Sequence, residues 1–173
     1  MFAEKVDEIQ MMYRCMESFE SDNNDREVKM KISTKGRYAL RLMIYIAANS
    51  NGKPVSIKDV AKNEDISDKY LEQIISILNS GGLVRSVRGP QGGYLLRKAP
   101  EDITVGAVLR LTEGTLAPVA CVEEDAPECE RESICSTYNL WKQLYSAICS
   151  VVDTTTIADL CNSRPEAGDE YCI

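Results

Sequence analysis

The sequence predicts a mainly α fold with a small β wing. Two short amphipathic stretches, separated by a polar turn, lie between Ser56 and Gly82. A hairpin pattern rich in glycine follows between Leu83 and Arg97. Further on, residues 137–152 carry apolar side chains at the three-and-four spacing of a long amphipathic helix. This order is typical of a winged helix-turn-helix followed by a long C-terminal dimerisation helix.

The first helix of the pair is expected to begin at Ser56, whose hydroxyl can accept hydrogen bonds from the free amides of the first turn. A polar turn at 63–65 separates it from a second helix, which Ser67 would cap and Gly81 with Gly82 would end. One face of the second helix is apolar and is expected to be buried. That face consists of Tyr70, Leu71, Ile74, Ile75 and Leu78.

The remaining face of the second helix is polar and predicts DNA recognition. Its side chains can donate hydrogen bonds to base edges in a major groove, or accept them. They are Lys69, Glu72, Gln73 and Asn79. This helix is therefore the candidate recognition helix.

The hairpin predicts a wing that approaches nucleic acid closely. Residues 83–87 alternate as one strand, 94–97 return as the second, and 88–93 form the turn. Three glycines and a proline share this turn with Arg88, so its backbone can come near a phosphate or a minor groove. A plain hairpin at the edge of a small domain is the alternative, because any hairpin uses glycine and proline in this way.

Charge is unevenly distributed along the chain. The net charge is −7, yet residues 31–100 hold 12 Lys and Arg against 5 Asp and Glu. Residues 1–30 hold 4 against 8, and residues 101–173 hold 4 against 14. A basic module between acidic ones fits a nucleic-acid-binding domain. Chance segregation of surface charge is the alternative, and the winged pattern argues against it.

The remaining segments are expected to support this domain. Residues 1–29 could form one amphipathic helix, but we favour Met30 as the true start of the protein. A helix after Ser33 should pack behind the helix-turn-helix, and Thr104 should cap another that ends at Gly114. The chain divides accordingly into the extension 1–29, the DNA-binding domain 30–100, a linking helix and cysteine loop 101–136, dimerisation and closing helices 137–162, and a flexible acidic tail 163–173.

The stretch 137–152 predicts a dimer. So wide an apolar face in a small protein favours pairing with the same helix of a second subunit. Packing within one chain is the alternative. The apolar residues are Leu140, Trp141, Leu144, Tyr145, Ile148 and Val152.

Composition favours a cytoplasmic protein that is not an enzyme. No stretch approaches the roughly 20 apolar residues that cross a bilayer, and no signal-peptide pattern opens the sequence. In a reducing compartment its seven cysteines should be free, metal-bound or redox-active rather than paired. The chain has no histidine, the commonest general base. It also lacks a phosphate-binding loop, a dinucleotide-binding glycine motif and a C-x-x-C pair.

Three blocks of sequence together resemble the bacterial winged-helix transcription regulators typified by IscR, NsrR and CymR. The blocks are 30–39 (MKISTKGRYA), 70–73 (YLEQ) and 87–94 (VRGPQGGY), and the likeness extends to about Leu160. It implies a dimeric winged helix that controls transcription at a double-stranded DNA operator. In IscR-like members a recognition-helix glutamate and a wing arginine read bases, and Glu72 and Arg88 match those positions. The neighbouring contacts would be Ser67, Lys69, Tyr70, Gln73, Gly89 and Gln91.

The resemblance also implies an iron-sulfur cluster. In the IscR and NsrR branches the loop before the long helix holds one, and the matching cysteines are Cys121, Cys129 and Cys135. Soft thiolates suit iron, and a loop can wrap a cluster without breaking a helix. A cluster of the 2Fe-2S or 4Fe-4S type would let the protein sense cluster status, redox conditions or nitric oxide. Structural zinc, a metal-free thiol switch and inert thiols are the alternatives.

This loop departs from the family pattern in two ways. Seven residues separate its first two cysteines, more than in the cluster-binding members, and five separate the second pair. The fourth ligand is open as well, because Tyr138 stands where IscR-like members have histidine, and Arg37 where one NsrR-like branch has aspartate. Cys149 lies about 21 Å along the helix from Cys135, too far to help, and like Cys15 and Cys161 it is interpreted as a spare or core thiol. The remaining candidates are Cys172, a loop carboxylate such as Glu132, and a group of the partner subunit.

The CymR branch provides the alternative function. Its members lack the cysteine loop and repress sulfur-metabolism genes together with a cysteine synthase. This chain ends in Ile173, as isoleucine ends the peptides that dock in cysteine synthase active sites. A free terminal carboxylate is easily captured, so cysteine synthase is a candidate partner.

Overall fold

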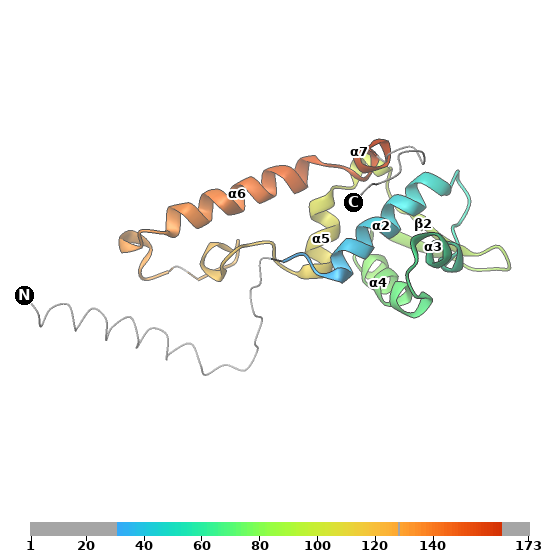
Figure 1. The fold of residues 1–173 in the computed structure, drawn as a ribbon, viewed down its shortest axis with the longest axis horizontal. Helices are drawn as coiled ribbons and strands as arrows, with labels where there is room; N and C mark the ends of the chain where they lie inside the picture. Colours follow the sequence, from blue (N-terminus) through green and yellow to red (C-terminus); the bar gives the residue numbers. More distant parts are fainter. Residues whose placement is uncertain (1–30, 128, 164–173) are drawn as a thin grey trace, which may run out of the picture.

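The computed structural model describes residues 31–127 and 129–163. A lobe formed by α2 to α5, α7 and a two-stranded sheet holds one end of the long helix α6, which otherwise runs away from the lobe (Figure 1). The predicted extension 1–29 and residues 164–173 of the predicted tail lie outside the described residues. In chain order the elements are α2 (Thr34–Asn49), α3 (Ile57–Glu64), α4 (Asp68–Ser80), β1 (Val84–Val87), β2 (Gly93–Leu96), the 3₁₀ helix η1 (Pro100–Asp102), α5 (Val105–Glu113), the 3₁₀ helices η2 (Ala120–Val122) and η3 (Glu132–Ile134), α6 (Tyr138–Thr154) and α7 (Ile157–Asn162).

Helix α2 lies at the centre of the lobe. The side chain of Ser33 caps it by accepting a hydrogen bond from the Gly36 amide. Apolar residues recur every three or four positions along α2, so one wide face enters the core between α4, α5 and α7. Our prediction that this helix packs behind the helix-turn-helix is confirmed. Its buried apolar residues are Ala39, Leu42, Met43 and Ile46.

The helix-turn-helix agrees with the predicted caps at α3 but differs from them at α4. The Ser56 side chain accepts hydrogen bonds from two amides of the first turn of α3, at 3.1 and 3.4 Å. Asp65 ends α3 in the left-handed conformation, with φ of 52°. The turn therefore begins later than the predicted 63–65, because Glu64 is still helical. Ser67 occupies the N-cap position of α4, but its side chain makes no capping hydrogen bond.

The wing is an antiparallel hairpin of β1 and β2, in which Val84 pairs with Leu96. The first strand starts one residue later than predicted, because the Leu83 amide donates to the Leu78 carbonyl at the end of α4, at 3.0 Å. The second strand starts one residue earlier, at Gly93. The predicted hairpin is confirmed, and these shifts come from its contact with the rest of the lobe.

A third backbone segment pairs with the wing. Val55, just before α3, exchanges two backbone hydrogen bonds with Tyr94, at 2.8 and 2.9 Å. A Cβ atom at Gly93 would overlap the Val55 carbonyl oxygen. Glycine is needed at this position because two backbones approach each other closely there.

Replacing Gly93 by alanine should therefore loosen the wing. We expect the free energy of unfolding to fall by about 1–3 kcal/mol, the usual cost of overpacking. Urea denaturation measures this change, and amide exchange at Val55 and Tyr94 should become faster. The control Ser86→Ala changes an exposed residue of the same hairpin and should shift stability by less than about 0.5 kcal/mol. Equal stability of the two variants would contradict the close approach.

The C-terminal helix α7 returns to the core of the lobe. The Val105 amide donates to the Thr155 carbonyl, and the Ile157 amide donates to the Ile103 carbonyl, both at 2.9 Å. The Ile157 side chain is fully buried against the same core as α2. Helix α7 therefore attaches the end of α6 to α2 and η1 of the lobe.

The predicted caps of the later helices are also present. The Thr104 side chain accepts a hydrogen bond from the Ala107 amide at 3.1 Å, and Gly114 follows the last residue of α5. Thr156 and Asp159 cap α7 reciprocally, each side chain accepting from the backbone amide of the other. The caps of α5 were predicted from residue spacing, because their contacts are local, whereas the capping box of α7 was not among the predictions.

Helix α6 packs on α5 along one apolar stripe. Tyr145, Ile148 and Val152 lie against α5, and Arg110 of α5 donates to the Asp153 carboxylate at 2.9 Å. These three residues belong to the apolar face that was predicted to pair with a second subunit, with packing inside one chain as the alternative. The structure shows instead that they pack within the chain.

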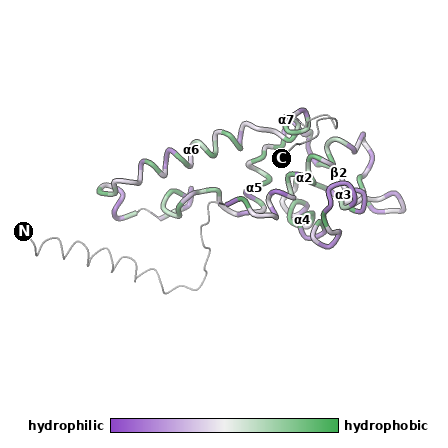
Figure 2. Tube along the Cα trace, in the orientation of Figure 1, coloured by the Kyte–Doolittle hydropathy of each residue, from purple (hydrophilic) through white to green (hydrophobic). Residues whose placement is uncertain are grey.

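A second apolar stripe on α6 is largely exposed, although Leu144 in it is half-buried. It consists of Leu140, Leu144, Ala147 and Val151, spaced three or four residues apart, and is called the open stripe below. Leu140 and Val151 are 55% and 63% exposed, and no residue of α6 is buried. Figure 2 shows the resulting alternation of hydrophobic and hydrophilic residues along α6. No helix in residues 31–127 and 129–163 is long and apolar enough to cross a membrane.

Candidate nucleic-acid interface and cysteine loop

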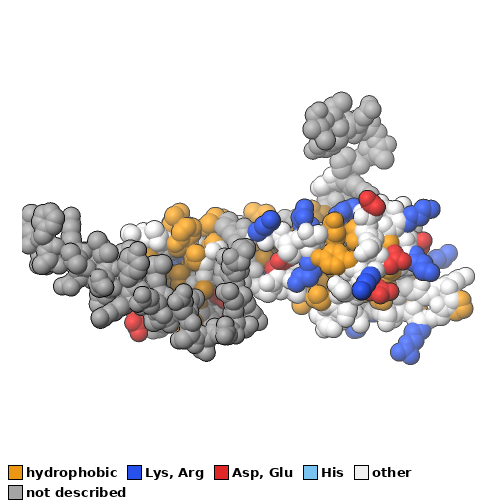
Figure 3. Space-filling view, turned by 60° about the horizontal axis from the view of Figure 1, so that its bottom comes forward, with side chains coloured by type: hydrophobic (Ala, Val, Ile, Leu, Met, Phe, Trp, Pro, Cys, Tyr) orange, Lys and Arg blue, Asp and Glu red, His pale blue; other side chains and the backbone are white. Residues whose placement is uncertain are grey.

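The polar face of α4 is presented to solvent. Burial of Leu71 and Ile74 in the core leaves Lys69, Glu72 and Gln73 exposed. Ser67 is exposed as well, and since its hydroxyl does not cap α4, it can meet a phosphate or base. Figure 3 shows Lys and Arg side chains spread over this lobe. A polar helix face on a basic lobe can enter a major groove.

Tyr70 differs from the other predicted contact residues because it is half-buried. Its ring packs edge-to-face on Tyr38 of α2, with ring centroids 5.9 Å apart. This contact fixes α4 against α2, so Tyr70 orients the recognition helix whether or not it also touches DNA.

A pair that sequence reasoning missed continues this contact. Glu64, at the end of α3, is only 9% exposed and accepts a hydrogen bond from Arg41 Nε at 2.8 Å. The Arg41 guanidinium also donates to the Glu64 carbonyl and lies over the Tyr38 ring, 5.4 Å from its centroid. Arg41, Glu64, Tyr38 and Tyr70 thus join α2, α3 and α4. Nothing in local spacing pairs residues 41 and 64, since only folding brings them together.

The tip of the wing exposes Arg88, Gly89 and Gln91. Gly89 has φ of 128°, a conformation that other residues rarely adopt, and its carbonyl accepts a hydrogen bond from the Gly92 amide at 2.9 Å. The tip is therefore a closed turn that carries one arginine at its edge. Arginine suits a narrow minor groove with its negative potential.

The cysteine loop and the first turns of α6 enclose a small cavity. A space of about 250 Å³ has both Cys121 and Cys129 in its wall. Cys135, in contrast, is exposed and shares a 3.5 Å hydrogen bond with Thr137. Within residues 31–127 and 129–163 no three His, Cys, Asp or Glu side chains are arranged to hold a metal ion. The other residues of the cavity wall are Val122, Glu123, Ala126, Pro127, Glu132, Tyr138 and Lys142.

The pKa values of three side chains in or beside this loop reflect their surroundings. Burial raises the pKa of Cys121, and repulsion by Cys129 and, more weakly, Cys135 raises it further. Hydrogen bonding to Thr137 lowers the pKa of Cys135. Burial and the nearby Glu132 carboxylate raise the pKa of Tyr138. Cys121 therefore senses the charge of the other two thiols, although the three side chains are not arranged to hold one metal ion.

Two other cysteines lie at helix contacts. Arg110 Nη2 donates to Cys149 Sγ at 3.5 Å, between α5 and α6. Cys161 of α7 lies 3.8 Å from the Ile44 carbonyl of α2. Both are half-buried, in line with the interpretation as core thiols, whereas Cys15 and Cys172 lie outside the described residues.

A winged helix-turn-helix with an exposed polar recognition helix defines a transcription regulator, and comparison with known proteins agrees. The chain belongs to the Rrf2 family, described as iron-dependent transcriptional regulators, whose family model matches residues 32–163. The predicted family and fold are thereby confirmed. A family of transcription regulators also fits our expectation that the chain is not an enzyme.

Relatives of this chain include members of both branches considered above. It is 42% identical to the HTH-type transcriptional regulator CymR of Bacillus subtilis over 142 residues, covering 82% of this chain and 97% of CymR. It is 38% identical to the HTH-type transcriptional regulator IscR of Yersinia pseudotuberculosis over 135 residues, covering 78% and 81%. The crystal structure of the B. subtilis CymR, the global cysteine regulator, has a TM-score of 0.64 and covers 78% of this chain and 98% of that one.

Proposed function

We propose that the chain is a cytoplasmic, dimeric regulator that binds a roughly palindromic DNA operator through α4 and the wing of each subunit. The observation that carries the proposal is the exposed polar face of α4 on a basic lobe, with a single arginine at the wing tip. Glu72 would accept from a cytosine amino group, and Arg88 would enter a narrow groove. The proposed neighbouring contacts are Ser67, Lys69, Tyr70, Gln73, Gly89 and Gln91.

Two substitutions distinguish base reading from phosphate contact. Arg88→Ala should weaken binding to the operator by about 1–3 kcal/mol and relax the sequence preference. Lys69→Ala should weaken binding to all sequences alike. It should also reduce the slope of log affinity against log salt concentration by about one. Fluorescence anisotropy with operator and random duplexes at several salt concentrations measures both effects. Unchanged affinity in both variants would eliminate this DNA face.

The open stripe supports the proposed dimer. Its four apolar side chains lie on the side of α6 that α5 leaves uncovered. An exposed apolar strip of this length, on a helix that projects from the lobe, is what pairing with the same helix of a second subunit would cover. The two recognition helices would then be presented together to the two half-sites of an operator.

We further propose that Cys121, Cys129 and Cys135 hold an iron-sulfur cluster whose occupancy changes the affinity for DNA. The donor chemistry fits a cluster, because thiolates are its usual ligands. Cys121 and Cys129 share one cavity, and Cys135 lies in the same loop just before α6. The three sulfur atoms must move closer to bind one cluster. When bound, the cluster would supply a centre sensitive to redox conditions, nitric oxide or iron supply. Glu132 in the cavity wall is a candidate fourth ligand, since Tyr138 stands where IscR-like members have histidine.

A cluster-free repressor of sulfur metabolism, of the CymR type, is the second candidate. It is favoured by the 42% identity to CymR and by the lack of a converged three-donor group among the described residues. The partner would then be a cysteine synthase that captures the C-terminal Ile173, which lies outside the described residues.

Anaerobic purification with iron and sulfide assays separates the two candidates. We expect brown wild-type protein with stoichiometric iron and sulfide, lost in Cys121→Ala, Cys129→Ala and Cys135→Ala alike. Cys161→Ala, a thiol in α7 away from the loop, should keep its colour and serves as control. Colourless wild-type protein after attempted reconstitution would contradict the cluster. Binding to a cysteine synthase, with and without Ile173, would then test the second candidate.

A further inference from the structure

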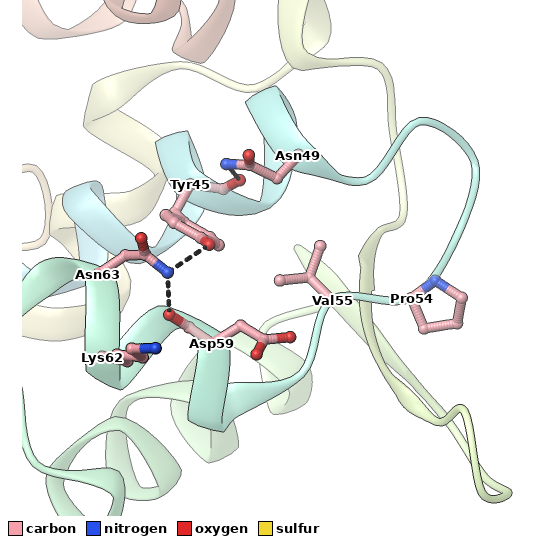
Figure 4. Close-up of a pocket in the computed structure, with 7 residues that line it drawn as sticks. All are labelled: Tyr45, Asn49, Pro54, Val55, Asp59, Lys62 and Asn63. Atoms are coloured by element: carbon pink, nitrogen blue, oxygen red, sulfur yellow. Dashed lines mark hydrogen bonds between the residues drawn. The ribbon is translucent and has the colours of Figure 1, made fainter. Parts of the chain in front are cut away.

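A polar cavity lies between α2 and α3, on the DNA-binding lobe and apart from the cysteine loop (Figure 4). Its volume is about 390 Å³, at the low end of the roughly 300–1,000 Å³ typical of small-molecule sites. The wall is formed by Tyr45, Asn49, Pro54, Val55, Asp59, Lys62 and Asn63.

Two opposite charges in the wall lack partners. The Asp59 carboxylate and the Lys62 ammonium lie one turn apart on α3, both exposed. Neither charged group makes a hydrogen bond or an ion pair within the part of the chain that the structure describes. A ligand with one positive and one negative group could therefore satisfy both.

Two neutral side chains of the wall, Tyr45 and Asn63, are fixed by hydrogen bonds and keep polar atoms free for such a ligand. Asn63 Nδ2 donates to the Tyr45 hydroxyl at 2.9 Å and to the Asp59 carbonyl at 2.8 Å, which uses both of its hydrogens. The Tyr45 hydroxyl accepts this bond, so its own hydrogen is left to donate, and Asn63 Oδ1 is left to accept. Pro54 and Val55 supply a small apolar wall.

We propose that this cavity binds a small zwitterion, an α-amino acid with a short side chain. The ligand's ammonium would pair with Asp59, and its carboxylate with Lys62 and the Tyr45 hydroxyl. A phosphate or other simple anion fits less well, because Asp59 would repel it. A simple cation is disfavoured for the same reason by Lys62.

The cavity is connected to both DNA-contacting elements. Val55 forms two hydrogen bonds with Tyr94 of the wing. Asn63 precedes Glu64, whose carboxylate is held by Arg41 beside the recognition helix. A bound ligand would thus change the affinity for DNA as well. This second effect rests on the proposed function, whereas binding of the amino acid itself does not.

NMR titration of the full-length ¹⁵N-labelled protein tests the proposal. The probes are the common L-α-amino acids one at a time, followed by the amine and the carboxylic acid that each lack one charge of the best binder. We expect an amino acid to shift the amides of Val55, Lys62 and Asn63, with a Kd on the order of 1 mM. The matched amine and acid should each bind about two- to fivefold more weakly. No shift with any amino acid at 20 mM, or equal binding of the amine or acid, would overturn the proposal.

Substitutions in α3 test whether the amino acid binds in this cavity. Asp59→Asn and Lys62→Gln should each weaken binding about two- to fivefold. Lys58→Gln, an exposed lysine of the same helix outside the cavity wall, should leave it unchanged. The dispersion of the amide spectrum checks that each variant is folded. If Lys62→Gln weakens DNA binding while amino-acid binding stays unchanged, the cavity is a phosphate contact and the proposal is wrong.

Discussion

Replacing Ile157 by alanine is expected to lower the free energy of unfolding by about 2–5 kcal/mol, the range for deleting a buried isoleucine side chain down to Cβ. Ile157 is fully buried and begins α7, where its amide also bonds to the Ile103 carbonyl. The cavity left behind would lie where α7 packs on α2 and η1. The loss should therefore loosen the attachment of α6 to the DNA-binding lobe as well as lower stability.

Urea denaturation at one fixed protein concentration measures this change, because dimer dissociation makes stability depend on concentration. The matched control is Ile134→Ala, the same chemical change at a residue that is 73% exposed. It should alter stability by less than about 0.5 kcal/mol. A similar small effect at Ile157 would mean that α7 is not anchored to the core in solution.

Replacing Ala147 by glutamate is expected to weaken the proposed dimer by about 3 kcal/mol or more, roughly a hundredfold or more in Kd, because each subunit would bury an unpaired carboxylate. Ala147 lies on the open stripe between Leu144 and Val151, and it is exposed in the single chain. Glutamate has good helix propensity, so α6 itself should be unaffected. Sedimentation equilibrium measures the dimer constant, and operator affinity should fall in parallel.

The neighbouring residue provides the control for this experiment. Ser146 is exposed but lies off the open stripe, about 100° away around the helix. Ser146→Glu introduces the same charge one position away and should leave the dimer constant nearly unchanged. If both variants dimerise like the wild type, the subunits do not meet along this stripe.

Many local features were predictable because their causes are local. Ser56, Thr104 and Gly114 cap helices as their positions in the sequence indicated. The apolar spacing of α2 and α4 identified the buried faces, since a helix brings residues three and four apart to one side. The wing followed from the glycines around Arg88. Ser67 shows the limit of such arguments, because it occupies the N-cap position without forming the capping bond.

The site was predictable only in part. Lys69, Glu72 and Gln73 are exposed as expected, because burying one face of α4 leaves the other to solvent. Tyr70 is held by Tyr38, which no spacing within α4 indicates. The cysteine loop was chosen by resemblance, and the structure places two of its three thiols in one cavity.

The sequence by itself determined the helix and strand order, the polar recognition face and the family, because these depend on residues close together in the chain. Tertiary structure alone decided which apolar stripe of α6 is left open, since α5 covers Tyr145, Ile148 and Val152 but leaves Leu140 and Val151 exposed. It alone also paired Arg41 with the buried Glu64. Such contacts join residues far apart in sequence, and periodicity within one helix cannot say which neighbour will cover which face.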